Sequence, residues 1–272
     1  MKTEALFRQD AYLRSCEART SRVDGDGLQL DRTVFYPQGG GQAGDRGWLT
    51  LDNGPRLRIA DTRKGKSSGA GPDDAPHIPD VGQASLQAKF AEGRLVYAEI
   101  DWERRYRHMR LHTAAHLLCA VLPFPVDGCS ITADYARLDF VTSDPLSRDS
   151  IDVALADLVA RRTVVSIDTM SNEELEVNPD LVRTICVKPP VGTGQVRLVR
   201  IEGVDVQPCG GTHVANTSGI GPGACRQDGK ENRAYTPRRV GTGIAATRVR
   251  LALMPWTTPA LRGSAYAKVE KS

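Results

Sequence analysis

The sequence predicts an N-terminal small β-barrel domain followed by an α+β domain with an antiparallel sheet and packed helices. Three observations lead to this fold class. Short alternating segments with turn residues between them fill the first hundred residues, as in a small barrel or sandwich. The pattern becomes helical after Asp101, and the later helices and strands do not alternate as regular βαβ units. We therefore expect a barrel domain at 1–100, a zinc-containing α+β domain at 101–255 and a tail at 256–272.

Several segments of the N-terminal part alternate apolar and polar residues and are predicted to be strands. They span residues 18–23, 27–34, 48–52, 57–60 and 95–100. The stretch 63–83 is rich in Gly, Ser, Pro and Asp and shows no periodicity, so we expect a mobile surface loop there. His77 lies in this loop and is expected to be a bystander.

The second part is predicted to begin with a helix over residues 102–122, which two following prolines end. A second amphipathic helix is predicted over residues 148–162, with a serine as its N-cap. Ser171, followed three residues later by Glu174, has the spacing of a capping box at another helix start. Strands are predicted over residues 131–142, 163–169, 196–201 and 245–253.

The composition, 40% hydrophobic and 25% charged, is that of an ordinary globular protein. No apolar signal-peptide region is visible, and no stretch is long enough to span a membrane. The six cysteines are scattered and form no CxxC pair. Without an export signal this pattern indicates reduced thiols, so we expect a cytoplasmic protein.

The net charge is only +3, but basic residues gather in two places. Such clusters are more often solvated faces, although local basic patches in a balanced chain also suit a nucleic-acid ligand. The first cluster contains Arg104, Arg105, Arg107 and Arg110, and the second contains Arg226, Lys230, Arg233, Arg238, Arg239, Arg248 and Arg250.

Two histidines on the predicted 102–122 helix are candidate metal ligands. His112 and His116 are four residues apart, so their imidazoles lie on one helical face and can converge on one ion. No Glu follows His112, which excludes the HExxH pattern of zinc proteases. Such pairs also occur without metal as surface or core residues. His108 lies one turn earlier on the same face, and we expect it to have a packing role.

A distant loop can complete the ligand set. Cys209 and His213 flank two glycines in the segment Cys-Gly-Gly-Thr-His, and thiolate and imidazole are preferred zinc ligands. Taken alone, this segment also fits a buried cysteine beside a turn. Together the two pairs make a set that fills a tetrahedron, or that leaves one position to water. We therefore predict one Zn²⁺ per chain, with His112, His116, Cys209 and His213 as its ligands.

The third feature is the glycine-rich segment FYPQGGGQ at 35–42. Gly39, Gly40 and Gly41 allow backbone amides to face a ligand, and the Gln42 amide can donate or accept beside them. No Lys-Ser/Thr follows, which excludes a phosphate-binding P-loop. As structure alone, the segment would be a flexible hairpin connection.

With these motifs the chain resembles the AlaX family of free-standing alanyl-tRNA editing proteins, which are similar to the editing domain of alanyl-tRNA synthetase. The resemblance covers about residues 3–253 and rests on LDRTVFYPQGGGQAGDRGWL, RLHTAAHLLCAVL, GCSITADYARLDF and QPCGGTHVANTSGIG. The glycine-rich motif before the histidine pair marks the longer members, which carry an N-terminal β-barrel. Two features depart from the family pattern: Ala43 replaces the usual proline, and the stretch 225–253 lacks the usual strand pattern.

The resemblance implies a zinc-dependent, ATP-independent trans-editing hydrolase that deacylates tRNA(Ala) mischarged with serine, with glycine as the second candidate. The implied catalytic residues are His112, His116, Cys209 and Gln42. The expected substrate-binding residues are Gly39, Gly40, Gly41, Gln42, Ser130, Thr132, Gly210 and Gly211. No membrane partner is expected. The sequence leaves the oligomeric state open, and a monomer is the simpler expectation.

Two other functions remain open at this stage. A zinc esterase or amidase acting on small molecules would not depend on RNA, and the arginines at 104–110 count against it. A non-catalytic tRNA-binding module would use zinc only as a structural ion, as closed Cys/His tetrahedra usually do. Structural sites often use two CxxC-like knuckles, whereas these ligands come from a helix and a distant loop.

Overall fold

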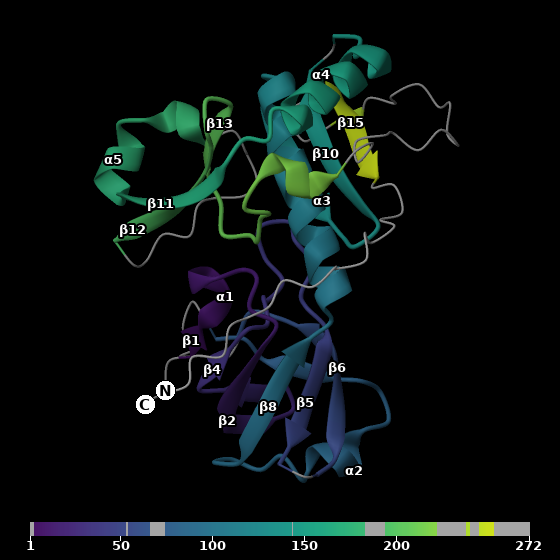
Figure 1. The fold of residues 1–272 in the computed structure, drawn as a ribbon, viewed down its shortest axis with the longest axis vertical. Helices are drawn as coiled ribbons and strands as arrows, with labels where there is room; N and C mark the ends of the chain where they lie inside the picture. The colour runs from purple at the N-terminus through teal and green to yellow at the C-terminus, as the bar shows by residue number, and fades with distance from the viewer. Residues whose placement is uncertain are drawn as a thin grey trace, which may run out of the picture.

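The computed structural model describes residues 3–52, 54–65, 74–142, 144–182, 194–221, 238–239 and 245–252 of the 272-residue chain. The predicted fold class is confirmed, because a closed barrel is followed by antiparallel sheets with packed helices (Figure 1). Arg226, Lys230, Arg233 and the tail at 256–272 lie outside the described residues. The division into domains at residue 100 stays a prediction.

The barrel closes in the strand order β2-β3-β7-β6-β5-β8. Its strands are β2 (Ser15–Asp24), β3 (Gly27–Leu30), β5 (Gly47–Leu51), β6 (Arg56–Thr62), β7 (His77–Pro79) and β8 (Leu95–Ile100). Apolar side chains at alternate positions of β5 and β8, such as Leu49 and Ala98, are fully buried in its interior. Three further short elements belong to this part of the chain: β1 (Glu4–Ala5) pairs with β4 (Arg32–Thr33), α1 (Leu6–Gln9) follows β1, and α2 (Ala84–Gln87) precedes β8.

The prediction of a surface loop over 63–83 is wrong for its second half, where β7 pairs with β3 and β6. His77 at the start of β7 is buried, with Nδ1 2.9 Å from the Leu28 carbonyl and Nε2 2.9 Å from the Thr33 hydroxyl. Burial lowers the pKa of His77 to about 4, so its ring is neutral at pH 7. His77 is therefore a structural residue of the barrel. A strand of three residues is too short to show alternation in the sequence.

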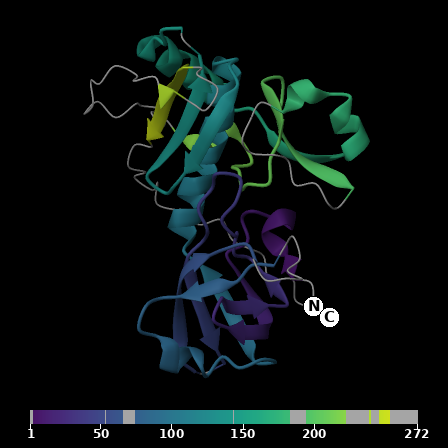
Figure 2. The ribbon, with the colours of Figure 1, turned by 180° about the vertical axis from the view of Figure 1, so that it is seen from behind.

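Helix α3 (Trp102–Val121) connects the barrel to the rest of the molecule and agrees with the predicted helix (Figures 1 and 2). Asp101 precedes it, and the Asp101 side chain caps it by accepting a 3.1 Å hydrogen bond from the Arg104 N–H. Its middle and second half are buried almost all round, because protein packs on several of its faces. This helix therefore holds its histidines away from solvent.

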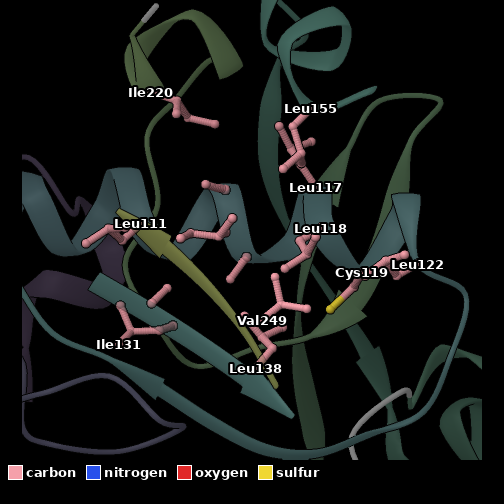
Figure 3. Close-up of a cluster of buried hydrophobic side chains, with 14 of the residues drawn as sticks. Leu111, Leu117, Leu118, Cys119, Leu122, Ile131, Leu138, Leu155, Ile220 and Val249 are labelled. Atoms are coloured by element: carbon pink, nitrogen blue, oxygen red, sulfur yellow. The ribbon is translucent and has the colours of Figure 1, made fainter. Parts of the chain in front are cut away.

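The larger sheet has the order β14-β15-β10-β9 and packs on α3 and α4 (Arg148–Ala160). Its strands are β9 (Val126–Ile131), β10 (Tyr135–Val141), β14 (Arg238–Arg239) and β15 (Ala245–Ala252). Figure 3 shows leucines of α3, among them Leu111 and Leu118, between the helix and the sheet residues Ile131, Leu138 and Val249. The strand predicted over 131–142 is confirmed as β10, but its predicted start is wrong, because β9 ends at Ile131 and a turn separates the two strands.

A smaller sheet of β11 (Val165–Ser171), β12 (Gln195–Ile201) and β13 (Asp205–Pro208) projects to the side of the larger one (Figures 1 and 2). The predicted capping box of Ser171 and Glu174 is confirmed at the start of α5 (Asn172–Glu176). Two 3-10 turns, Pro179–Leu181 and Thr217–Ile220, complete the described elements. Among the residues described, no helix is both long and apolar enough to cross a membrane.

Candidate metal centre

The structure brings together the four side chains that the sequence predicted as metal ligands. His112 and His116 come from α3, whereas Cys209 and His213 come from the loop after β13. One ligand atom from each residue lies within 4.8 Å of those of the other three. The Sγ of Cys209 is 3.4 Å from Nε2 of His112 and 3.3 Å from Nε2 of His213. Four donors at these separations can surround one ion.

Two of the histidine rings are oriented by a hydrogen bond at Nδ1. Nδ1 of His112 lies 2.8 Å from Oε1 of Gln42, and Nδ1 of His213 lies 3.3 Å from the Thr113 hydroxyl. That hydroxyl donates to the Met109 carbonyl at 2.9 Å, so it is free to accept from His213. An acceptor at Nδ1 fixes the tautomer and leaves Nε2 for a metal.

The third ring, that of His116, is held by a carboxylate. Its Nδ1 lies 2.9 Å from Oδ2 of Asp205, which is buried and also accepts from the Gln207 amide at 2.9 Å. Burial alone would lower the pKa of His116, but the Asp205 carboxylate and the neighbouring Cys209 raise it to about 9. Sequence reasoning missed Asp205 and Thr113. A carboxylate four residues before Cys209, and a threonine next to His112, were the available signals.

The electrostatics favour a thiolate at Cys209. Burial opposes ionisation, but the imidazoles of His112 and His213 hold the pKa of the thiol well below its usual value. Burial and the charge of His112 lower the pKa of His213 to about 3, which keeps that ring neutral. Thiolate and neutral imidazole are the forms that bind metal. The Arg197 guanidinium fixes the loop by donating to the carbonyls of Cys209 at 2.6 Å and Gly211 at 3.1 Å.

Gln42 joins the glycine-rich segment to this centre. Its side chain is fully buried, and its Nε2 donates to the Thr212 hydroxyl at 2.9 Å. Its Oε1 accepts from the Thr212 N–H at 3.1 Å as well as facing His112. The structure therefore places Gln42 on the Nδ1 side of His112, where it orients that ring.

Backbone conformation requires glycine at some positions of the two loops, and lack of space for a side chain requires it at others. Gly40 and Gly41 have φ values of +58° and +81°, and the Gly41 carbonyl accepts from the Ile131 N–H of β9 at 2.7 Å. A Cβ on Gly211 would lie 2.1 Å from Cε1 of His112, so only glycine fits there. A Cβ on Gly210 would meet nothing within 4 Å, and one on Gly39 would meet only the flexible Lys64 side chain.

The remaining predicted site residues lie near this centre without contacting it. Ser130 pairs with Arg137 across β9 and β10, on the opposite face of β9 from the buried Ile131. The Thr132 hydroxyl donates to the Tyr135 carbonyl at 3.1 Å and closes the β9–β10 turn. A role for either hydroxyl in substrate binding stays a prediction. His108 is buried, and neither of its ring nitrogens has a hydrogen-bond partner within the described part of the chain.

The first arginine cluster is not one continuous surface patch. Arg105 is fully buried in an ion pair with Asp45, and its Nη2 also donates to the Val34 carbonyl at 2.6 Å. Arg110 is buried as well and donates to the Ile220 carbonyl at 2.8 Å. Helical spacing turns these two toward the protein, because α3 packs against the barrel loops and the 217–220 turn. Arg107 is exposed and Arg104 is half-buried.

The second arginine cluster is described only in part. Arg248 pairs with Asp139 at 2.7 Å, and the Arg250 guanidinium lies over the Tyr135 ring at 5.3 Å from its centroid. Arg238 and Arg239 form β14, which pairs with β15. The departure from the family pattern at 225–253 therefore still ends in a strand of the larger sheet.

The chain is similar in sequence to known proteins over most of its length. Residues 196–234 match the family described as threonyl and alanyl tRNA synthetase second additional domain. The chain is 35% identical over 243 residues to the alanyl-tRNA editing protein AlaX-M of Methanosarcina barkeri, covering 85% of this chain and 96% of that protein. It is 31% identical over 226 residues to AlaX-M of Saccharolobus solfataricus, covering 80% and 90%. It is also 38% identical over 231 residues to the alanine–tRNA ligase of Metallosphaera sedula, covering 80% of this chain but 24% of the ligase.

Proposed function

Because the chain belongs to the family of AlaX-M alanyl-tRNA editing proteins, we propose that it deacylates mischarged tRNA(Ala). The proposed substrate is tRNA(Ala) carrying serine, with glycine as the second candidate. The observation that carries this proposal is the convergence of His112, His116, Cys209 and His213 within 4.8 Å, directly beside the glycine-rich segment. The other candidate functions, a zinc hydrolase of small molecules and a tRNA-binding module, are outcomes of the test below.

The chemistry of the amino acids explains the need for such an enzyme. Alanine and serine differ by one hydroxyl group, and a synthetic site cannot strongly reject a ligand that only adds a small polar group. A second site that hydrolyses the wrong ester removes the error. Such a site needs an activated water and donors for the developing oxyanion.

One zinc ion per chain is the proposed cofactor, held by the four converging side chains. The donor set suits zinc, since it combines one thiolate with three imidazoles whose Nδ1 atoms already have acceptors. When bound, zinc lowers the pKa of water or polarises a carbonyl. Gln42, Asp205 and Thr113 would keep the three rings in place while the substrate binds.

The glycine-rich segment is proposed to border the aminoacyl group. The N–H groups of Gly40 and Gly41 make no hydrogen bond within the part of the chain that the structure describes, so they are free to donate to an ester carbonyl. Gly210 has open space beside it, and Gly211 allows the 209–213 loop to approach His112 closely. Gly39 and the hydroxyls of Ser130 and Thr132 complete the proposed substrate contacts.

The test measures release of amino acid from tRNA(Ala) charged separately with radiolabelled serine, glycine and alanine. We expect fast release of serine, slower release of glycine and no release of alanine. A Cys209→Ala variant and a chelator-treated sample should both lose the activity. Hydrolysis of small esters without any preference for charged tRNA would support the small-molecule hydrolase. One bound zinc with no hydrolysis would leave the tRNA-binding module.

A further inference from the structure

A basic pocket of about 270 Å³ lies where the barrel meets the start of α3. We call it the junction pocket. Its basic residues come from the barrel and from the first turns of α3. The barrel part contributes Arg46 and Arg58, and α3 contributes Arg104 and Arg107. Trp48 of the barrel and Ala133 of the β9–β10 turn also line it. The metal ligands take no part in it. Its volume is sufficient for a phosphate group with part of a nucleotide.

Three of its four arginines form no ion pair with a described carboxylate, and arginines outnumber carboxylates in the pocket by four to two. Arg46, Arg104 and Arg107 form no ion pair with any carboxylate of the described residues, whereas Arg58 lies 3.5 Å from Asp80. The pocket also contains Asp101 and Glu103, but the Asp101 carboxylate is engaged in capping α3. The positive charges outnumber the negative ones in this pocket, so its arginines repel one another, and a bound anion reduces that repulsion.

A second observation points to a missing ligand. Nε of Arg104 is buried and has no hydrogen-bond partner among the described residues. A buried guanidinium N–H without an acceptor is costly, since water no longer solvates it. Burial and the charge of Arg46 also lower the pKa of Arg104, which shows how close these two cations lie. An anionic oxygen in the pocket would satisfy the free donor and separate the like charges.

The junction pocket lies at the N-terminal end of α3, and the metal centre lies further along the same helix. Arg104, His108, His112 and His116 follow one another at intervals of four residues along α3. The helical rise places Arg104 about 12 Å from His112 along the axis. Arg46 follows Gln42 by four residues, and Ala133 follows Thr132. An RNA strand whose 3′ end reaches the metal centre can therefore place a backbone phosphate in this pocket.

We propose that the junction pocket binds a backbone phosphate of the tRNA acceptor end, through Arg46, Arg104 and Arg107. The inference rests on the proposed function, because it assigns a second contact to the same substrate. Arginine forks suit phosphate oxygens, and each neutralised phosphate adds to the salt dependence of binding. The contact is independent of base sequence, so it positions the strand without selecting tRNA(Ala).

The test uses the full chain and uncharged tRNA(Ala), so that no hydrolysis is needed. Binding is measured by fluorescence anisotropy over a series of salt concentrations, for the wild type and for an Arg46→Gln/Arg107→Gln double variant. The matched control is Arg94→Gln/Arg161→Gln, which removes two exposed arginines, one directly before β8 and one directly after α4. Thermal unfolding of each variant checks that it is folded.

We expect the pocket variant to bind tRNA about tenfold more weakly, with a salt slope reduced by about one because one phosphate contact is lost, while the control stays near the wild type. Equal losses in both double variants, or no loss in the pocket variant, would overturn the inference. A different result would contradict the proposed function: the wild-type protein would bind tRNA(Ala) but would not release serine from Ser-tRNA(Ala).

Discussion

Gln42 and His112 are joined by a buried contact of 2.8 Å between the Gln42 amide oxygen and Nδ1 of the imidazole. Gln42 belongs to the glycine-rich loop of the barrel part, whereas His112 belongs to α3. The same oxygen accepts from the Thr212 N–H of the second ligand loop at 3.1 Å. One amide therefore fixes the relative positions of three segments at the candidate metal centre.

Replacing Gln42 with alanine should weaken zinc binding about 10-fold to 100-fold, the range found for outer partners of metal-bound histidines. The reason is that Nδ1 of His112 loses its acceptor, so the ring is no longer held in one orientation. Competition with a chromogenic chelator measures the affinity. Gln38→Ala, an exposed neighbour in the same loop, is the control and should bind zinc as the wild type does. An unchanged affinity in Gln42→Ala would remove Gln42 from the positioning role.

Two adjacent glycines give a sharper steric test. Gly211→Ala places a Cβ 2.1 Å from Cε1 of His112, whereas Gly210→Ala meets nothing within 4 Å. We expect Gly211→Ala to lower the free energy of unfolding by about 1–3 kcal/mol, as overpacking does, and to displace His112 from the ion. Gly210→Ala should change neither stability nor zinc affinity. Chemical denaturation and chelator competition on both variants make the comparison, and equal behaviour of the two would contradict the loop geometry.

The pH dependence of metal binding follows from His116. Its pKa of about 9 in the metal-free protein means that a proton must leave before the ring binds an ion. Zinc affinity should therefore fall about tenfold for each pH unit below about 9. Asp205→Asn removes the carboxylate charge that holds this proton, so the fall should begin at lower pH.

Chelator competition over a series of pH values tests this dependence. The exposed Asp157→Asn variant has the same charge change and should keep the wild-type profile. If Asp205→Asn also keeps that profile, the Asp205 carboxylate does not set the protonation of His116.

The buried ion pair of Asp45 and Arg105 connects the barrel to α3, and both side chains are at most 1% exposed. Removing one partner leaves an uncompensated buried charge, so Asp45→Ala should lower the free energy of unfolding by about 3–5 kcal/mol. Adding Arg105→Met should recover part of the loss. Glu99→Ala breaks the exposed pair with Arg56 and should cost at most about 1 kcal/mol. Denaturant titrations measure all three, and similar losses for Asp45→Ala and Glu99→Ala would contradict this account.

The fold class and the four metal-site residues could be predicted because their signals are local. Alternation in the barrel strands, the i and i+4 spacing of His112 and His116, and the short Cys209–His213 loop are all visible in a few residues. The capping box at Ser171 is of the same kind.

The remainder depends on contacts between distant segments. Asp205 can be recognised as a partner of His116 only once β13 has placed it beside that ring. His77 becomes part of a strand only through the pairing of β7 with β3 and β6. The burial of Arg105 and Arg110 could not be predicted from the sequence for the same reason. Their charge suggested a surface, but their partners Asp45 and Ile220 are far away in the chain.

The most direct test is a zinc titration of metal-free protein in which serine release from Ser-tRNA(Ala) is followed at each step. We predict that the rate rises with added zinc and levels off at one equivalent per chain, and that Cys209→Ala shows no rise. Full activity without metal, or one bound zinc without serine release, would contradict the assignment of His112, His116, Cys209 and His213 as the centre of a zinc-dependent tRNA deacylase.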